Sequence, residues 1–146
     1  RGRVLRRRRR GVRRVRFVDT SFWVALGFRR GAHHDAARAL WADRDGKAVL
    51  TSNHVLGETW TFLRRRAGHA AAVGFVDRVE QSRRVGILRV DEATEAEAIA
   101  WLRRHDERAY SFVDATSFAL MRRERLRDAL AFDGDFSAAG FVEVRP

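Results

Sequence analysis

The chain has 146 residues, a net charge of +11 and 45% hydrophobic residues, which is the size and composition of one globular domain. The lack of cysteine excludes disulfides and cysteine-based metal centres and fits a reducing cytoplasm, where we expect the protein to act. The five histidines form no HExxH motif, and no apolar run approaches the ~20 residues that span a membrane, so we expect no membrane partner.

The positive charge is concentrated in an arginine-rich N-terminal arm, residues 1–14. The first sixteen residues hold ten arginines and no acid, so only +1 of the net charge of +11 remains for the rest. Such an arm can bind phosphate backbones without sequence preference. The alternative is a disordered extension upstream of the natural start, with Val4 as a misread start codon. Residues 15–146 are expected to form a single domain.

The first half of the chain alternates short β-branched or aromatic runs with helical segments. Ala36, Ala37, Leu40 and Trp41, for example, recur at helical spacing with charges between them. The elements expected here, in order, are a strand at 15–18, helices at 21–28 and 33–45, a strand at 47–51, and a helix that Ser52 or Asn53 caps and that ends at 64–66.

The second half continues the same alternation. A helix at 91–107 carries acids early and Arg103 and Arg104 late, an order that suits the helix dipole. The other elements expected are a helix at 69–82, a strand at 86–90, a helix from Ser111 to about 124, and strands at 128–132 and 141–145. Strands that alternate with helices predict an α/β fold around a mainly parallel sheet.

Four carboxylates lie beside these elements and suggest a metal site. Asp19 directly follows the first expected strand and Asp133 the fourth, and ligand sites of parallel sheets form at the carboxyl ends of strands. Asp114 is in the first turn of a helix, and Glu58 lies further along another. Hard divalent cations prefer such oxygen ligands and can activate water for phosphodiester hydrolysis. Asp135 is an alternative or additional fourth carboxylate.

Each acid also has a purely structural interpretation. Asp19 could cap a helix in a strand-to-helix turn, and Asp114 could form a capping box with Ser111. Asp133 begins an Asp-Gly pair that is common in turns, and Glu58 could be a solvated helix residue. Taken one at a time, these residues leave both interpretations open.

The order of the acidic phrases resembles the PIN domain family and, within it, the VapC-type toxins. The phrases are FVDTS, LGETW, SFVDATS and AFDGDF followed by GFVEV, and the resemblance covers residues 15–146. It implies a three-layer α/β/α sandwich whose metal ligands are Asp19, Glu58, Asp114 and Asp133. Ser21 would orient Asp19 or a ligand water. Ala131 departs from the family pattern, which often has threonine two residues before the fourth acid.

The resemblance also implies a function. Family members cleave RNA with Mg²⁺ or Mn²⁺, commonly dimerise, and are silenced by a small antitoxin that occupies a groove. We therefore expect a metal-dependent endoribonuclease, the toxin of a type II toxin–antitoxin pair. One alternative is a non-catalytic nucleic-acid-binding module that uses the arginine-rich arm, and another is a phosphatase or DNA nuclease with similar metal ligation.

Further basic residues outside the arm allow two interpretations. They form runs at residues 64–66 and 122–127, each near the end of an expected helix. They could line an RNA path, or they could be ordinary solvated helix ends.

Overall fold

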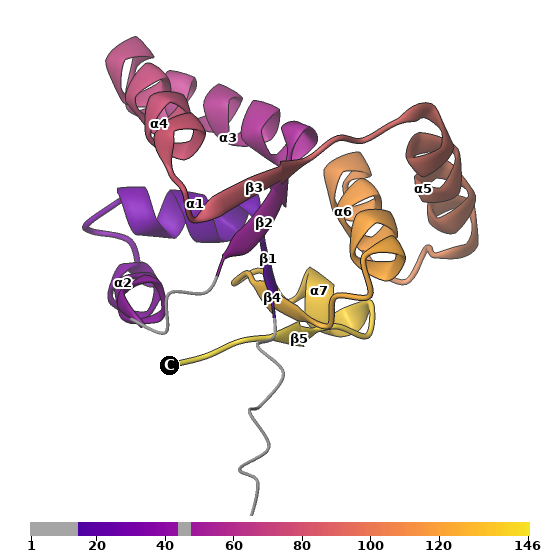
Figure 1. Cartoon of the computed structure of the whole chain (residues 1–146). Coiled ribbons are helices and arrows are strands. Elements are labelled where there is room, and N and C mark those ends of the chain that lie inside the picture. The colour runs from indigo at the N-terminus through magenta and orange to yellow at the C-terminus, as the bar shows by residue number, and fades with distance from the viewer. Residues whose placement is uncertain (1–14, 44–47) are drawn as a thin grey trace, which may run out of the picture.

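The structure, a computed structural model, describes residues 15–43 and 48–146. The expectations for the arginine-rich arm at 1–14 lie outside the described residues, as do the expected end of the helix at 33–45 and the first residue of the strand at 47–51. The described residues form a central sheet flanked by helices (Figure 1).

The central sheet has five strands, all parallel, in the order β3-β2-β1-β4-β5. The strands are β1 (Arg16–Val18), β2 (Val49–Ser52), β3 (Val85–Leu88), β4 (Asp128–Leu130) and β5 (Val142–Glu143). The prediction of a mainly parallel sheet is confirmed. The chain builds outward from β1 to β3 and then returns to place β4 on the other side of β1, which makes the gap between β1 and β4 the topological switch point.

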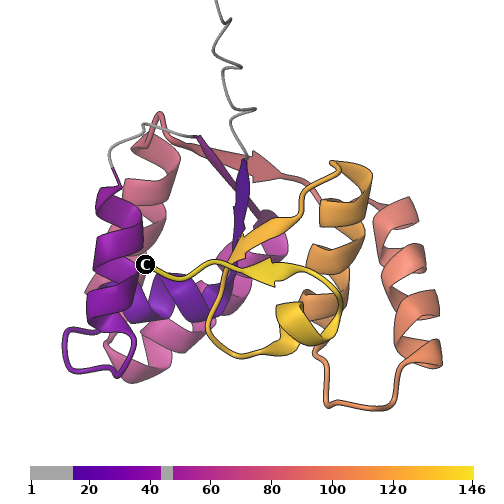
Figure 2. The ribbon, with the colours of Figure 1, turned by 90° about the horizontal axis from the view of Figure 1, so that it is seen from below.

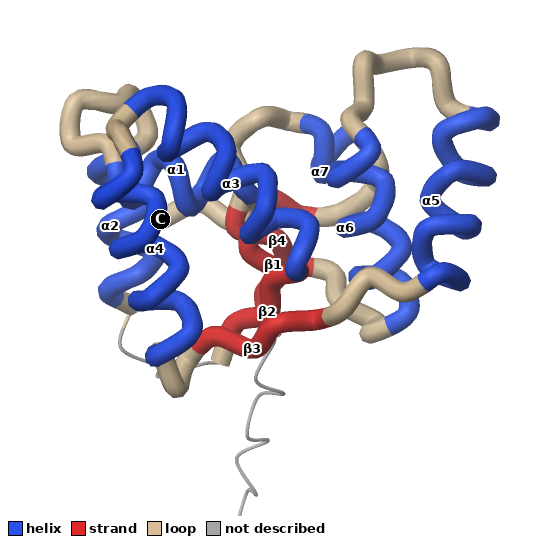
Figure 3. The backbone as a smooth tube through the Cα atoms, turned by 90° about the horizontal axis from the view of Figure 1, so that it is seen from above, coloured by secondary structure: helices blue, strands red, loops and turns tan. Residues whose placement is uncertain are grey.

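Seven helices in the described residues cover the two faces of this sheet. They are α1 (Thr20–Gly27), α2 (His34–Ala42), α3 (Asn53–Arg66), α4 (His69–Gln81), α5 (Glu92–Arg104), α6 (Phe112–Arg123) and α7 (Asp135–Ala138). Helices α1–α4 lie on one side, and α5, α6 and α7 lie on the other (Figure 3). The view from below shows the same division (Figure 2). Right-handed crossovers require this arrangement when strand order reverses, and the predicted three-layer α/β/α sandwich is confirmed.

The predicted elements begin and end within three residues of the observed bounds, and two differences from the predictions have a clear structural cause. The helix expected at 91–107 ends at Arg104, where His105 stacks on Trp101 with ring centroids 4.1 Å apart and closes the helix with a bond to the Leu102 carbonyl. The short helix α7 was not predicted, because four residues carry no periodicity. It follows Gly134, whose φ of 81° lies in the left-handed region that glycine favours.

The core lies on both faces of the sheet and is rich in aromatic rings. Phe17 of β1 and Phe118 of α6 are fully buried and both contact the ring of Phe136. Trp23 and Trp101 are also buried, as expected for packing residues. Among the helices of the described residues, none combines the length and apolar character that a membrane crossing requires.

Candidate active site

The candidate site lies at the switch point between β1 and β4. The two strands pair in register, with Phe17 opposite Ala129 and Val18 opposite Leu130. The backbone N–H of Asp19 continues the pairing by donating to the Leu130 carbonyl at 3.0 Å. The chain segments that carry Asp19 and Asp133 therefore leave adjacent strands at the same edge of the sheet, where ligands of such folds bind.

Asp19 is held by Ser21 in the first turn of α1. One carboxylate oxygen, Oδ2, accepts from the Ser21 N–H at 3.0 Å and from the Ser21 hydroxyl at 2.7 Å. The Ser21 oxygen in turn accepts from the N–H of Phe132 at 3.0 Å, which connects Asp19 to the segment after β4. Asp19 is thus the N-cap of α1. It is not one of the three acids whose carboxylate oxygens lie within 4.8 Å of one another, but the charges of Asp133 and Asp114 raise its pKa.

Asp114 is held by a capping box at the start of α6. The Asp114 N–H donates to Ser111 Oγ, and the Ser111 N–H donates to Asp114 Oδ2, both at 2.9 Å. The structural interpretations of Asp19 and Asp114 are therefore correct. They do not compete with a functional one, because a carboxylate has more acceptor positions than these bonds occupy.

The turn after β4 brings two more acids to Asp114. A carboxylate oxygen from each of Asp114, Asp133 and Asp135 lies within 4.8 Å of the other two. Asp133 Oδ1 also accepts from the N–H of Asp135 at 3.1 Å, which tightens the turn. The structure therefore groups three acids that the sequence placed in two separate phrases.

The pKa values of these acids reflect their crowding. Burial and then the charge of Asp133 raise the pKa of Asp19 to about 7, and burial raises the pKa of Asp114 to about 6. Burial and the neighbouring carboxylates of Asp135 and Glu143 raise the pKa of Asp133. Each shift is the expected response of an anion that has lost water and gained like charges. A cation placed among these oxygens would remove the repulsion, and the all-oxygen donor set fits Mg²⁺ or Mn²⁺.

Glu58 is on α3 and is not part of the three-acid group. Its side chain is half-buried and lines a hollow together with Val113, the residue before Asp114. Glu58 thus approaches the start of α6, but the group of mutually close carboxylates in the described residues forms without it. Its role as a metal ligand stays a prediction.

The turn that carries Asp133 and Asp135 is held by two residues, Arg108 and Glu143, that were not predicted from the sequence. Arg108 Nε donates to Asp135 Oδ1 at 2.9 Å. The side chain of Glu143 in β5 is only 3% exposed, and its carboxylate accepts from the N–H groups of Gly134 and Ser137, both at 3.1 Å. The phrase GFVEV marked the closing strand, but no sequence signal shows that its glutamate turns toward Gly134.

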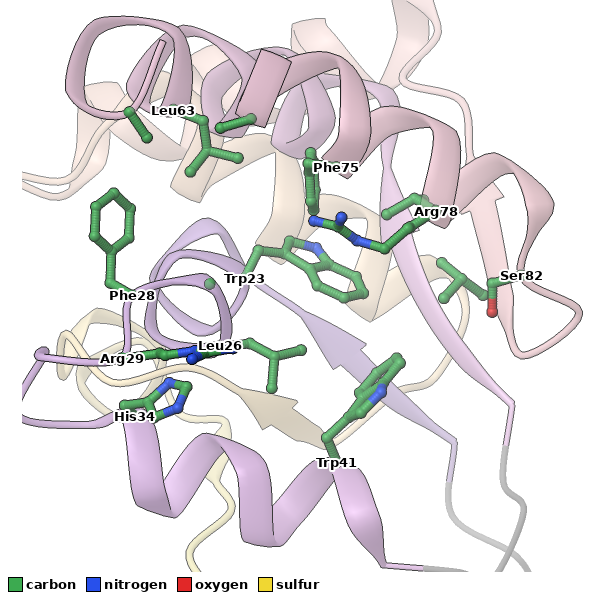
Figure 4. Close-up of a pocket in the computed structure, with 15 residues that line it drawn as sticks. Trp23, Leu26, Phe28, Arg29, His34, Trp41, Leu63, Phe75, Arg78 and Ser82 are labelled. Atoms are coloured by element: carbon green, nitrogen blue, oxygen red, sulfur yellow. The ribbon is translucent and has the colours of Figure 1, made fainter. Parts of the chain in front are cut away.

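A separate apolar cavity of about 770 Å³ lies among α1, α2, α3 and α4. Trp23 lies in the middle of its wall, with Arg29 and Arg78 on opposite sides (Figure 4). None of the four predicted metal ligands lines this cavity, so it is distinct from the acidic site.

Comparison with known proteins identifies relatives of the whole described domain. The PIN domain family matches residues 16–142. The 23S rRNA-specific endonuclease VapC20 of two Mycobacterium tuberculosis strains, CDC 1551 / Oshkosh and H37Rv, is 59% identical over 133 residues, which cover 89% of this chain and 98% of each relative.

A solved structure gives the same result. The crystal structure of M. tuberculosis VapC20, described as a Sarcin-Ricin loop cleaving toxin, superposes with a TM-score of 0.84 at 58% identity and covers 89% of this chain and 98% of that one. The strand order, the acids at the switch point and these similarities agree: the chain belongs to the PIN domain family and, within it, to the VapC-type toxin ribonucleases.

Proposed function

We propose that the protein is a metal-dependent endoribonuclease in which Asp19, Asp114 and Asp133 hold one or two Mg²⁺ or Mn²⁺ ions. The observation that carries the proposal is the convergence of carboxylates with raised pKa values at the switch point. When bound, the metal supplies positive charge that activates a water and stabilises the leaving oxygen of the phosphodiester. Glu58 completes the ligand set from α3.

The protein's own residues supply position. Ser21 holds the Asp19 carboxylate in one orientation through two hydrogen bonds to the same oxygen. Both of these bonds are to Oδ2, so Oδ1 is available to a metal ion. Asp135 acts as an additional acid whose charge is partly balanced by the guanidinium of Arg108 at 2.9 Å.

The proposed substrate is the sarcin–ricin loop of 23S ribosomal RNA. The support is the identity of 59% with a 23S rRNA-specific endonuclease over nearly its full length, and the similarity to a solved structure described as a Sarcin-Ricin loop cleaving toxin. A ribosomal substrate places the action of the protein in the cytoplasm.

The proposed partners are a small antitoxin and a second copy of the chain. The apolar cavity among α1, α2, α3 and α4 offers the antitoxin a docking place, because Arg29 and Arg78 beside its aromatic wall suit an amphipathic segment that carries acids (Figure 4). The family resemblance supports homodimerisation, and light scattering of the purified chain would test it.

The test is cleavage of a synthetic sarcin–ricin loop hairpin by the wild type and by Asp114→Asn, each with Mg²⁺, Mn²⁺ or EDTA. Asparagine keeps the Oδ acceptor for Ser111, so the helix cap persists while a charged ligand is removed. We expect the variant to cleave at least 100-fold more slowly, because an acid that holds catalytic metal is missing.

The matched control is Asp91→Asn, which changes an aspartate that caps α5 through Thr94 and lies outside the acidic site. It should cleave at the wild-type rate. Full activity of Asp114→Asn, or of the wild type in excess EDTA, would refute the proposal.

A further inference from the structure

A hollow of about 590 Å³ runs along one face of α3, and one of the residues that line it, Val113, directly precedes Asp114 in the chain. Its floor is a helical stripe of His54, Glu58, Thr61 and Arg65, spaced so that they lie one above another on the same face. The opposite face of α3 is buried in the core. The stripe is about 16 Å long, since a helix rises about 1.5 Å per residue.

The two ends of the hollow have different chemistry. At the end beside α6 it is bounded by Val113, which precedes Asp114, and by His54. At the far end it is bounded by Arg65 and Arg66, both exposed. Arg64, the third arginine of the same run, does not line the hollow. Of the three consecutive arginines, Arg65 and Arg66 therefore line the hollow and Arg64 does not.

An exposed aromatic ring stands at the end beside the acids. Phe112, the first residue of α6, is 39% exposed, although phenylalanine is usually buried. Its ring lies 5.7 Å from that of His54, measured between centroids. The ring is therefore held next to the hollow and only two residues from Asp114.

We propose that this hollow is the path of the RNA strand beside the cleavage site, an inference that rests on the proposed ribonuclease function. Arg65 and Arg66 bind backbone phosphates, which guanidinium groups contact through paired hydrogen bonds. Phe112 stacks against a base next to the scissile bond, as aromatic rings do in single-strand binding sites.

The dimensions and the charges agree with this assignment. Successive phosphates of a stacked strand lie about 3.4 Å apart along its axis, so a hollow of about 16 Å follows more than one phosphate. Glu58 alone among the charged residues that line the hollow is an acid, and it lies toward the proposed metal site. Arginines along the hollow can position the backbone of a strand, and an aromatic ring near the metal site can hold one of its bases.

The test measures the affinity of full-length protein in the non-cleaving Asp114→Asn background for the sarcin–ricin hairpin, by fluorescence anisotropy across a salt series. The double variant Arg65→Ala/Arg66→Ala should weaken binding about tenfold or more. It should also flatten the salt dependence by about 0.7 in log–log slope for each phosphate that is no longer neutralised. Arg64→Ala, which removes the same charge from the same helix end, is the matched control and should have a much smaller effect.

Phe112→Ala should weaken binding about tenfold without changing the salt slope, because stacking is not ionic. The control is Ile99→Ala, another exposed apolar residue, on α5. Phe112→Leu keeps the apolar volume and removes the ring, so it tests stacking even if the alanine variant folds poorly. Thermal unfolding of each variant checks that the fold persists.

The outcomes separate this inference from the proposed function. If the wild type does not cleave the hairpin with Mg²⁺ or Mn²⁺, the proposed function fails. If it cleaves, but the double arginine variant binds as Arg64→Ala does, the RNA path is overturned. A double variant that binds RNA normally and changes its oligomeric state in light scattering would also overturn it, because the face would then belong to a contact between protein molecules.

Discussion

Asp19 and Asp114 are both proposed metal ligands, and each also lies at the start of a helix. Asp19 caps α1 and Asp114 closes the capping box of α6. Alanine at either position would remove a cap, at a cost of about 1 kcal/mol, and would also remove a charge. Asparagine keeps an acceptor oxygen and changes only the charge, so it separates the loss of the charge from the loss of the helix cap.

The raised pKa of Asp19 predicts how pH changes the stability of the metal-free protein. Its pKa is about 7 in the folded chain and 3.8 ordinarily, so the folded state holds the proton more tightly than the unfolded state. The contribution to stability is complete below pH 4 and is lost as pH rises through 7, by on the order of 1–4 kcal/mol.

In excess EDTA, the melting temperature of the wild type should therefore fall between pH 5 and pH 8. Asp19→Asn keeps an acceptor for Ser21 but has no charge to desolvate, so its melting temperature should fall less over the same range. Parallel curves for the two proteins would contradict the assignment.

At the scale of the element, the turn between β4 and α7 is held from two sides. Arg108 donates to Asp135 from the segment before α6, and Glu143 accepts from Gly134 and Ser137 on the other side. The turn carries two acids of the site, so its conformation sets where their oxygens lie.

Glu143→Gln should loosen this turn. The carboxylate of Glu143 accepts from backbone N–H groups through both of its oxygens. In glutamine one of these oxygens is replaced by an NH₂ group, which would face a backbone N–H donor, so one hydrogen bond is lost and two donors repel each other. We expect Mn²⁺ affinity, measured by calorimetry, to fall about tenfold, the usual effect of removing a group that orients ligands.

Glu97→Gln, which changes an exposed acid paired with Arg122 on α5 and α6, is the control and should bind Mn²⁺ as the wild type does. Equal affinity for the Glu143 and Glu97 variants would show that the turn keeps its shape without the carboxylate.

The sequence allowed most elements to be predicted, because periodicity and caps are local signals. The capping box at Ser111 and the positions of the acids after β1 and β4 follow from neighbouring residues in the sequence. Asp19, Asp114 and Asp133 could therefore be proposed as site residues from the sequence alone. Arg108 could not, because its partner Asp135 lies 27 residues away. A pairing of this kind depends on how the segment between α5 and α6 lies against the start of α7 in the folded chain, and a local sequence pattern does not predict that.

At the scale of the whole molecule, charge is divided between the domain and the arm. Residues 1–14 hold nine of the thirty basic residues, and the domain alone is close to neutral. If the arm binds phosphates, its removal should reduce the salt dependence of RNA affinity by several units of log–log slope.

Cleavage of RNA at saturating concentration should stay unchanged after this truncation, because the acids lie in the domain. The measurement is anisotropy and single-turnover cleavage for the full chain and the truncated chain. Loss of all cleavage on truncation would favour the alternative in which the arm is central to function.

The sheet order brings together segments that are far apart in the chain: Asp19 follows β1, Asp133 follows β4 and Asp114 lies in α6. A metal ion shared by these three acids, as we propose, would act as a removable cross-link that restricts the chain much as a disulfide does. Hydrogen exchange at residues 19–22, 111–115 and 131–135 should therefore slow together when Mn²⁺ is added, and a chelator should release all three segments at once.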